Sequence, residues 1–410
     1  MDYKACRFCG TELKDTFVDL GMSPLSNSYV KLENLKRKES YYPLHAYVCS
    51  KCFLVQLEEC ESPENIFSEY AYFSSYSSTW LKHVEEYVNM MTKKLELSTN
   101  STVLEIASND GYLLQFFNKK GIPVIGVEPA TNVALEAEKK GIYTVKDFFS
   151  FKLAEQLKCN KVEADLLIAN NVLAHVPNIN DFVAGMKKIL KYNGVITIEF
   201  PHLLKLINEN QFDTVYHEHY SYLSLVAVTR IFEKHGLLIF DVEELNTHGG
   251  SLRIYAKHFE DSTKEVSANV TAIINKEIEF GLEDLNTYKA FSQKVQSIKR
   301  NILSFLIKCK GEGKQIVGYG APAKGNTLLN YCGIGTDFLD YTVDKSPHKQ
   351  GLFLPGSHIP IYPLDKIIET KPDYIVILPW NIKEEVIQDM EKIKEWNGKF
   401  IILIPNIKED

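Results

Sequence analysis

The sequence predicts an α/β protein with a parallel, doubly wound sheet in the middle of the chain. A small cysteine-bearing unit precedes this sheet, and a second α/β unit follows it. Three observations carry the prediction. At 410 residues the chain is too long for one ordinary hydrophobic core, so two or three domains are expected. Short apolar runs alternate with helical segments from Val103 onward, and four of the eight cysteines form two close pairs near the N-terminus.

The composition is that of a soluble globular protein, with 45% hydrophobic and 24% charged residues. A net charge of −7 argues against a nucleic-acid partner. No apolar run is long enough to cross a bilayer, and the polar start MDYKACRFCG is unlike the apolar region of a secretory signal. We therefore expect a cytosolic protein without a membrane or nucleic-acid partner.

The N-terminal unit, expected over residues 1–75, carries the paired cysteines. Cys6 and Cys9 stand in CRFC, and Cys49 and Cys52 stand in CSKC. In a reducing cytosol two such pairs favour a structural, tetrahedral zinc site over disulfides. A redox pair or four reduced core thiols are the alternatives. The remaining cysteines are expected to be buried core thiols: Cys60, Cys159, Cys309 and Cys332.

The central unit is expected over residues 76–265. Its apolar runs predict strands at 103–107, 124–130, 142–147, 165–169 and 194–200. Helices are predicted between them at 112–121, 131–141 and 178–194. This order of elements means a parallel sheet with its binding site at the carboxyl ends of the strands.

Candidate cofactor-binding residues stand at those strand ends. They are Glu105, Ala107, Asn109, Asp110 and Gly111 after the first strand, Glu128 and Pro129 after the second, Asp147 after the third, and Asn170 and Asn171 after the fourth. Glu128 suits a ribose, because one carboxylate can accept hydrogen bonds from both hydroxyls.

The turn after the first strand is poor in glycine and contains an acidic residue, Asp110. A nicotinamide dinucleotide needs close approach of the backbone to its pyrophosphate at this turn, which disfavours that cofactor. A cofactor without phosphates, S-adenosylmethionine, fits better. An α/β core without function is the alternative.

The C-terminal unit is expected over residues 266–410. Residues 277–314 read as a charged pair of amphipathic helices. The stretch QIVGYGAPAKGNTLLN then reads as strand, glycine-rich turn and helix, and YTVDKS, DYIVILP and FIILIP as further strands. A glycine-rich turn that opens a helix offers backbone N–H groups to an anion, and Lys324 adds a positive charge.

The stretch YHEHYSYLS, residues 216–224, concentrates histidine, glutamate and tyrosine. It is consistent with a proton-transfer site, a metal site or a polar loop without chemistry. The metal interpretation is the weaker one, because the two histidines lack the helical spacing of HExxH.

Several stretches together resemble the sugar C-methyltransferases that act on nucleotide-linked 4-keto sugars. The matching stretches are CRFCG, YVCSKC, LEIASNDGYLL, GVEPA, NNVLAHV, YHEHYSYLS, THGGSLRIY, VGYGAPAKGNTLLN and DKSPHKQGLFLPGSHIPI, which run nearly from end to end. Ala107 departs from the pattern, since a glycine is often found there.

The resemblance implies an N-terminal zinc-binding domain, a central class I (Rossmann-like) methyltransferase sheet that binds S-adenosylmethionine, and a C-terminal Rossmann-like substrate domain. It also implies a nucleotide-linked 4-keto sugar as substrate, dTDP-linked or alternatively GDP- or CDP-linked, and a monomeric protein. The diphosphate is then the anion expected at Gly320, Ala321, Lys324 and Asn326. His248, Ser251 and Arg253 are expected to line the cleft, with Arg253 either pairing with a phosphate or bracing the domain interface.

By the same resemblance, Tyr216, Glu218 and His219 occupy the active-site motif, and His175 is carried over with them. The C3 proton of a 4-keto sugar needs a positioned base and a donor to the enolate oxygen. We predict His219 as the base, with Glu218 orienting it or contacting the sugar. Tyr216 and Tyr222 are predicted to donate to the oxyanion, and Tyr70 or Tyr72 to wall the cleft.

Two other functions stay open from the sequence alone. One is an oxidoreductase that uses either Rossmann-like sheet, and the other is a zinc scaffold without catalysis. Binding of S-adenosylhomocysteine, of NAD, or of neither would separate the three.

Overall fold

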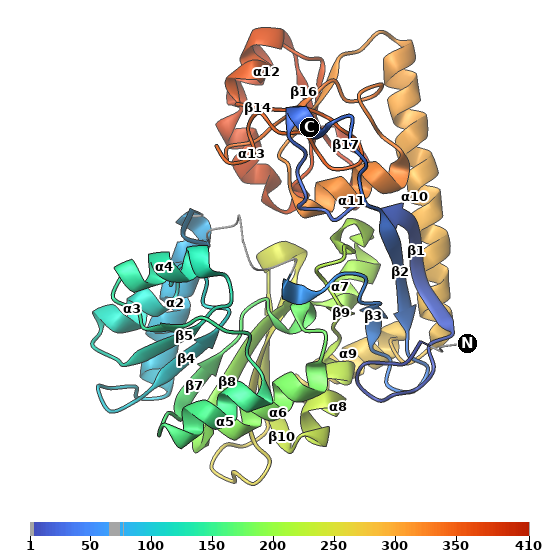
Figure 1. Ribbon diagram of the computed structural model, residues 1–410. Helices are drawn as coiled ribbons and strands as arrows, with labels where there is room; N and C mark the ends of the chain where they lie inside the picture. Colours follow the sequence, from blue (N-terminus) through green and yellow to red (C-terminus); the bar gives the residue numbers. More distant parts are fainter. Residues whose placement is uncertain (1–3, 65–73, 77, 410) are drawn as a thin grey trace.

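The computed structural model describes residues 4–64, 74–76 and 78–409, which form three sheets (Figure 1). The predicted α/β class is confirmed, and so are the cysteine-bearing N-terminal unit and the two larger α/β units. Tyr70 and Tyr72 lie outside the described residues. In the part of the chain that is described, no helix is long and apolar enough to cross a membrane.

The N-terminal sheet is antiparallel, in the order β1-β2-β3-β9. Its strands are β1 (Asp15–Ser23), β2 (Tyr42–Val48), β3 (Val55–Leu57) and β9 (Ser221–Tyr222). The last strand comes from YHEHYSYLS, because Val55 pairs with Tyr222 and Gln56 with Ser221. The N-terminal unit is thus joined by backbone pairing to the candidate active-site motif.

The central sheet has seven strands in the order β10-β11-β8-β7-β4-β5-β6. Their bounds are β4 (Val103–Ile106), β5 (Val124–Val127), β6 (Thr144–Val145), β7 (Ala164–Ile168), β8 (Leu190–Pro201), β10 (Leu237–Leu245) and β11 (Ser251–His258). The five strands predicted from the sequence are parallel, as expected. Strand β11 runs antiparallel to both of its neighbours, β8 and β10.

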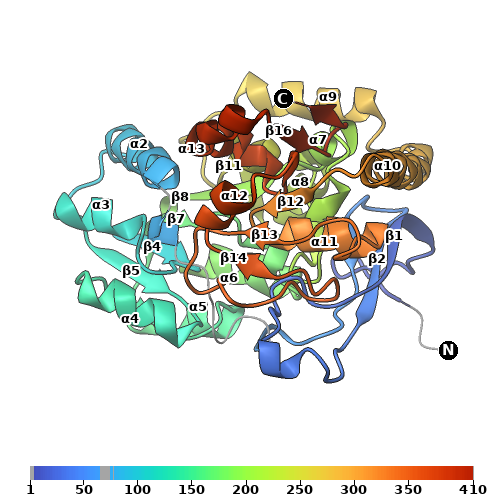
Figure 2. The same ribbon diagram turned by 90° about the horizontal axis from the view of Figure 1, so that it is seen from above.

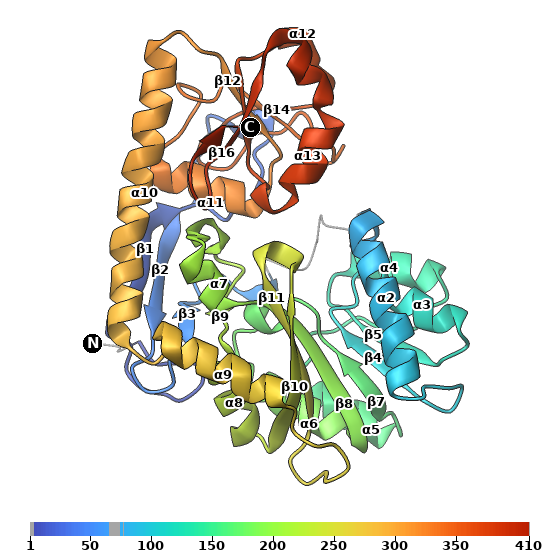
Figure 3. The same ribbon diagram turned by 180° about the vertical axis from the view of Figure 1, so that it is seen from behind.

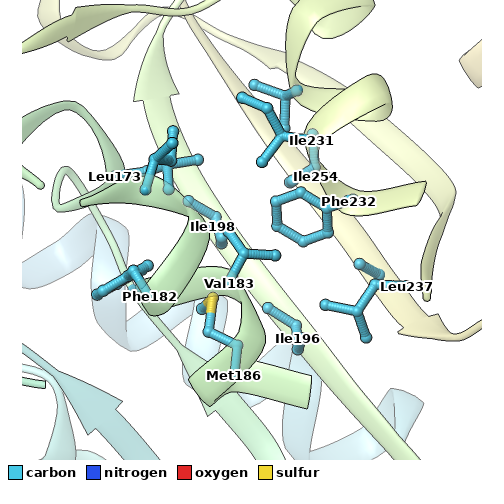
Figure 4. Close-up of a cluster of buried hydrophobic side chains, with 14 of the residues drawn as sticks. Leu173, Phe182, Val183, Met186, Ile196, Ile198, Ile231, Phe232, Leu237 and Ile254 are labelled. Carbon is cyan, nitrogen blue, oxygen red and sulfur yellow. The ribbon is translucent and has the colours of Figure 1, made fainter. Parts of the chain in front are cut away.

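Helices cover both faces of this sheet. They are α2 (Ser78–Lys94), α3 (Leu114–Lys119), α4 (Thr131–Lys139), α5 (Phe151–Cys159), α6 (Ile179–Ile189) and α8 (Leu225–Lys234). Helix α7 (Leu203–Asn208) instead packs in the cluster that the N-terminal and C-terminal sheets share. Successive strand residues point to opposite faces, so Val103 packs with α2 and α3, whereas Leu104 packs in the cluster of α5, α6 and α8. Figure 4 shows this second cluster, where Met186 and Phe232 lie beside Ile196 of β8.

Two sequence predictions need correction. Helix α6 was expected to continue to Gly194, but it ends at Ile189, because Leu190 begins β8 and pairs with Ala164 of β7. Of the four unpaired cysteines, Cys309 and Cys332 are buried as expected, whereas Cys159 is exposed at the end of α5 and Cys60 is only partly buried.

The C-terminal sheet follows the predicted helix pair, α9 (Ala268–Phe280) and α10 (Leu285–Gly311). Its strand order is β14-β13-β12-β15-β16-β17, parallel except for β17. The elements are β12 (Ile316–Tyr319), α11 (Ala323–Cys332), β13 (Thr342–Val343), β14 (Ile361–Tyr362), α12 (Asp365–Thr370), β15 (Tyr374–Ile377), α13 (Lys383–Asp389), β16 (Lys399–Ile402) and β17 (Lys408–Glu409).

Helix α10 links the C-terminal sheet to the rest of the molecule by running along the N-terminal hairpin (Figures 1 and 3). The ring of Phe17 in β1 stacks on Phe291 of α10 with centroids 4.8 Å apart, and Tyr288 meets it edge-on. Seen from above, the C-terminal unit covers the region where the N-terminal and central sheets meet (Figure 2).

Candidate functional site

The four paired cysteines form one cluster. The Sγ atoms of Cys6, Cys9, Cys49 and Cys52 all lie within 4.8 Å of one another. The separations of 3.5 Å for Cys6–Cys52 and for Cys9–Cys49 are far too long for disulfides and suit four thiolates around one ion. Within residues 4–64, 74–76 and 78–409 this is the one such cluster, so the histidines of YHEH have no metal-site geometry there.

The turn after β4 adopts an unusual backbone. Ala107, Asn109 and Gly111 all have positive φ angles, of 55°, 49° and 73°. Glycine takes this conformation without strain and asparagine tolerates it, but alanine does so at a cost. The sequence departure at Ala107 therefore falls on a residue whose backbone conformation favours glycine.

Glu128, at the end of β5, holds this turn in place. Its Oε2 accepts a hydrogen bond from the backbone N–H of Asn109 at 2.9 Å, and its Oε1 accepts one from Ala130 at 2.9 Å. A carboxylate has about four lone-pair positions, so two remain for the hydroxyls of a ribose. Pro129 lies between Glu128 and the start of α4.

The other strand-end residues differ in whether their side-chain polar atoms have hydrogen-bond partners. Asn170 is 7% exposed, and neither atom of its side-chain amide has a hydrogen-bond partner among the described residues. Such an orphaned buried amide fits a site that receives a polar ligand. Asn171 lies beside it, with its Nδ2 3.3 Å from Nε2 of His248.

The acidic residues near this turn are less available. Burial raises the pKa of Glu105 well above its ordinary value, which favours the protonated form of this side chain. Asp110 is paired with Lys140 at 3.2 Å. Asp147 is exposed, and its carboxylate accepts the backbone N–H of Phe148.

His219 is held by the short 3-10 helix η4 (Phe212–Thr214). Its Nδ1 lies 2.9 Å from the backbone carbonyl oxygen of Thr214. A carbonyl oxygen only accepts, so Nδ1 carries the proton and Nε2 keeps its lone pair. Burial lowers the pKa of His219 well below its usual value, and the charges of His175 and Lys324 lower it further. The imidazole is therefore neutral at pH 7.

The aromatic predictions converge on this imidazole. The ring centroids of Tyr216, His175 and Tyr222 lie 4.0, 4.7 and 6.1 Å from that of His219. Burial raises the pKa of Tyr222 well above 10, so its phenol keeps its proton and can donate it in a hydrogen bond. His175 belongs to the 3-10 helix η3 (Leu173–His175), and its Nδ1 lies 2.8 Å from the carbonyl oxygen of Glu218.

The carboxyl of Glu218 makes a contact that the sequence did not suggest. Its Oε1 accepts a hydrogen bond of 2.6 Å from Nδ2 of Asn27 in the N-terminal unit. The carbonyl of Thr214, not this carboxyl, orients the ring of His219. Glu218 is only 6% exposed, and burial raises its pKa to about 7.

The glycine-rich turn after β12 is less open than predicted. The N–H of Gly320 donates to the carbonyl of Val343, and that of Ala321 donates to Oδ2 of Asp344 at 2.8 Å. Both amides are therefore occupied by protein acceptors and do not provide free donors to an anion. Gly320 has φ = 87°, and a Cβ there would come within 2.6 Å of Pro379.

Lys324 opens helix α11 and faces the central unit. Its Nζ lies 2.7 Å from Oδ1 of Asn381 and 4.5 Å above the ring of Trp380. Trp380 in turn donates its indole N–H to the fully buried carboxylate of Asp213, at 2.7 Å. Asn326 is turned elsewhere, since its Nδ2 donates to the carbonyl of Ser26.

Arg253 in β11 braces the central sheet. Its guanidinium donates to Glu199 of β8 and to Glu243 of β10, at 2.9 and 3.0 Å, and lies over the ring of Tyr87. The two roles left open for Arg253 were pairing with a phosphate and bracing the domain interface. Its contacts brace the strands of the central sheet. Ser251 is similarly occupied, because its hydroxyl donates to the carbonyl of Thr247.

Three residues near the site were not predicted from the sequence: Asn27, Asp213 and Trp380. Asn27 and Asp213 sit outside any recognisable motif. Trp380 had a usable signal, because it follows β15 at the carboxyl edge of a parallel sheet, where binding residues gather.

Comparison with known families divides the chain into three matches. Residues 6–67 match a family described as “Putative zinc binding domain”, residues 80–241 a “Methyltransferase domain”, and residues 246–405 a “C-methyltransferase C-terminal domain”. A curated relative, the C-methyltransferase NovU of Streptomyces niveus, is 32% identical over 400 residues, which are 98% of this chain and 95% of that protein.

Two solved structures that match cover less than half of this chain. An S-adenosylmethionine-dependent methyltransferase from Clostridium acetobutylicum is 14% identical with a TM-score of 0.36, covering 43% of this chain and 92% of that one. Magnesium protoporphyrin IX methyltransferase from Synechocystis is 15% identical with a TM-score of 0.34, covering 43% and 81%.

Proposed function

Because this chain belongs to the family of sugar C-methyltransferases, we propose that it deprotonates C3 of a nucleotide-linked 4-keto-deoxysugar and methylates the resulting enolate carbon. The chain is an enzyme whose cofactors are S-adenosylmethionine and a structural zinc ion held by the cysteine cluster. This membership removes the oxidoreductase and scaffold alternatives. We propose a division at residues 75 and 265 into zinc-binding, methyltransferase and substrate-binding units.

The neutral imidazole of His219 is the observation that carries the proposal. Its Nδ1–H is fixed on the carbonyl of Thr214, which leaves Nε2 as the proton acceptor. A base for a carbon acid must be unprotonated before it reacts, and the lowered pKa of His219 ensures this at neutral pH.

The groups around His219 supply the rest of the site. The phenols of Tyr216 and Tyr222 remain our candidates to donate to the enolate oxygen as it gains charge. His175 borders the ring of His219 on another side. Bound S-adenosylmethionine would supply an electrophilic methyl group, and Glu128, Asn109 and Asn170 are the residues proposed to hold it.

The nucleotide is proposed to lie toward the C-terminal unit, where Lys324 offers a cation. Its ammonium is near enough to His219 and Asp213 to influence the pKa of both. Because the amides of Gly320 and Ala321 are occupied, we propose that Lys324 carries the attraction for the diphosphate without them.

A direct test offers dTDP-, GDP- and CDP-linked 4-keto-deoxysugars together with S-adenosylmethionine labelled with 13C in the methyl group. The expected product has the labelled methyl carbon bonded to C3, seen by long-range correlations between the methyl carbon and the neighbouring ring protons in the NMR spectrum. Label on a hydroxyl oxygen, or on another ring carbon, would contradict the proposed reaction.

A further inference from the structure

One segment of the N-terminal unit, residues 24–30, lies between the YHEH loop and helix α11. The carbonyl of Ser26 accepts a hydrogen bond from Asn326 at 2.7 Å, and the hydroxyl of Tyr29 donates to the carbonyl of Ala321 at 2.6 Å. Val30 pairs with Phe353 through two backbone hydrogen bonds. The segment is therefore fastened to the C-terminal unit along its length.

The same segment contacts the YHEH loop directly at Glu218, and Thr327 of α11 links it indirectly to Val215, the residue before the loop. Nδ2 of Asn27 donates to Oε1 of Glu218 at 2.6 Å, which is short for a hydrogen bond of this kind. The hydroxyl of Thr327 lies 3.4 Å from that of Ser26 and donates to the carbonyl of Val215 at 3.1 Å. Asn27 is itself exposed, whereas Glu218 behind it is buried.

A buried carboxyl with one strong donor has a protonation state that depends on this donor. Burial raises the pKa of Glu218 to about 7, and the hydrogen bond from Asn27 opposes that rise. No lysine or arginine side chain makes a hydrogen bond or ion pair with Glu218 among the described contacts. The amide of Asn27 is thus the group that favours the ionised form.

We propose that Asn27, in the zinc-binding unit, is a positioning residue of the active site, which keeps the carboxyl of Glu218 ionised and oriented for the methyl transfer. The role in methyl transfer rests on the proposed function, but the effect on Glu218 does not. The zinc-binding unit then contributes to the reaction site itself, in addition to its structural metal.

Other titratable groups face Glu218 and have to be kept constant in a test. Tyr29 and Tyr220 both lie close enough that the charge of Glu218 helps to raise their pKa, after burial as the main cause. His175 touches the backbone of Glu218, and the buried His217 and the partly buried His219 flank it in the sequence. A substitution at Asn27 also removes the 3.4 Å contact between its Oδ1 and the hydroxyl of Tyr29, which keeps its shorter hydrogen bond to the carbonyl of Ala321.

The test is to titrate Glu218 in the full-length, zinc-loaded protein by infrared spectroscopy, following the band of the protonated carboxyl. The Glu218→Gln variant identifies the band by its loss. Asn27→Leu has nearly the same size and removes the donor, so the midpoint is expected to rise by about one pH unit or more. Asn27→Asp places a second carboxyl there and is expected to raise the midpoint further.

Ser28→Ala is the matched control, because this exposed neighbour donates to the carbonyl of Leu25 and to no other group among the residues that the structure describes. It should leave the midpoint unchanged. An unchanged midpoint in Asn27→Leu, with the protein folded and zinc-loaded, would overturn the proposal.

The pH profile of kcat/KM for methyl transfer separates the two levels of the proposal. In Asn27→Leu, the acidic limb of this profile should shift to higher pH by the same amount as the infrared midpoint. If the infrared midpoint moves and the limb stays, methyl transfer does not depend on the ionised carboxyl of Glu218 and the proposal fails at that level. If methyl transfer to a sugar is absent from the wild type, the proposed function fails while the infrared result still decides the effect of Asn27.

Discussion

The Nδ1 atom of His219 lies 2.9 Å from the backbone carbonyl oxygen of Thr214. This contact fixes one tautomer of the imidazole and points the acceptor nitrogen away from η4. Thr214 directly follows Asp213, whose carboxylate receives the indole N–H of Trp380 from the C-terminal unit. The proposed base is therefore positioned from a loop that the C-terminal unit helps to hold.

The buried carboxyl of Asp213 predicts a pH-dependent effect on stability. Burial raises its pKa in the folded protein to about 6, above the ordinary value of 3.8. Ionisation then costs folding free energy as the pH rises from about 4 to about 6, and the cost is constant above that range. One pKa unit corresponds to about 1.4 kcal/mol, so the full cost is roughly 3 kcal/mol.

Asp213→Asn is expected to remove this cost while its carbonyl still accepts from Trp380. The variant should unfold at a higher denaturant concentration than the wild type at pH 7.5, with the gain shrinking toward zero at pH 4. Asp365→Asn, at an exposed site, is a suitable control. A gain that is equal at both pH values would show that Asp213 does not titrate as described.

Glu128 predicts the affinity for the cofactor. Glu128→Gln keeps one acceptor for the turn but loses the charge, and it should weaken binding of S-adenosylhomocysteine by roughly 1–3 kcal/mol in isothermal titration. Glu138→Gln changes an exposed glutamate in the following helix and should bind like the wild type. Equal affinity in both variants would show that Glu128 does not bind the ribose.

Ala107 predicts a contrast between two substitutions. Ala107 has φ = 55°, a conformation that glycine adopts without strain. Ala107→Gly should therefore leave the free energy of unfolding unchanged or raise it by up to about 1 kcal/mol. Ala107→Val adds a β-branched side chain at the same φ and should lower it by more than about 1 kcal/mol. Thermal unfolding of the pair checks this, and a valine variant as stable as wild type would contradict the strain at this turn.

The cysteine cluster predicts one zinc ion per chain. Metal analysis of protein purified without added zinc should find it, and Cys49→Ser should lose it together with stability of the N-terminal unit, because structural zinc contributes directly to folding. Cys159→Ser changes an exposed thiol outside the cluster and should keep full zinc content. Folded wild-type protein with no zinc would refute the assignment.

The sequence predicted what depends on local pattern. Strand and helix order in the central unit follows from alternating apolar runs, and the Cys6–Cys9 and Cys49–Cys52 pairs meet because each pair sits on one tight turn. Residue types in YHEH left a proton-transfer site, a metal site and a polar loop open, and the described residues show no metal cluster there.

Contacts between distant segments could not be predicted from local sequence patterns. Asn27 and Glu218 are 191 positions apart, and Trp380 and Asp213 are 167 apart, so nothing local in either segment marks them as partners. The two roles of Arg253, pairing with a phosphate or bracing the domain interface, stayed open from the sequence because its carboxylate partners stand on two other strands. The end of α6 was misplaced because the pairing of Leu190 with Ala164 overrides the helical pattern that continues to Gly194.

The most direct test of the account concerns the proton at C3 of the sugar. Deprotonation does not need the methyl group, so S-adenosylhomocysteine can replace the donor while exchange is followed in D2O by NMR. The substitution His219→Asn keeps a polar side chain and removes the base. Because the base acts in the transition state, its removal should slow exchange more than it weakens ligand binding. Tyr192→Phe, on an exposed ring far from the site, is the matched control.

Wild type and Tyr192→Phe should both exchange the C3 proton for deuterium without methylating the sugar. His219→Asn should bind both ligands and show no exchange above the uncatalysed rate. Exchange at the wild-type rate in the His219→Asn variant would contradict the central claim and would transfer the role of base to another group, with His175 or a tyrosinate as the candidates.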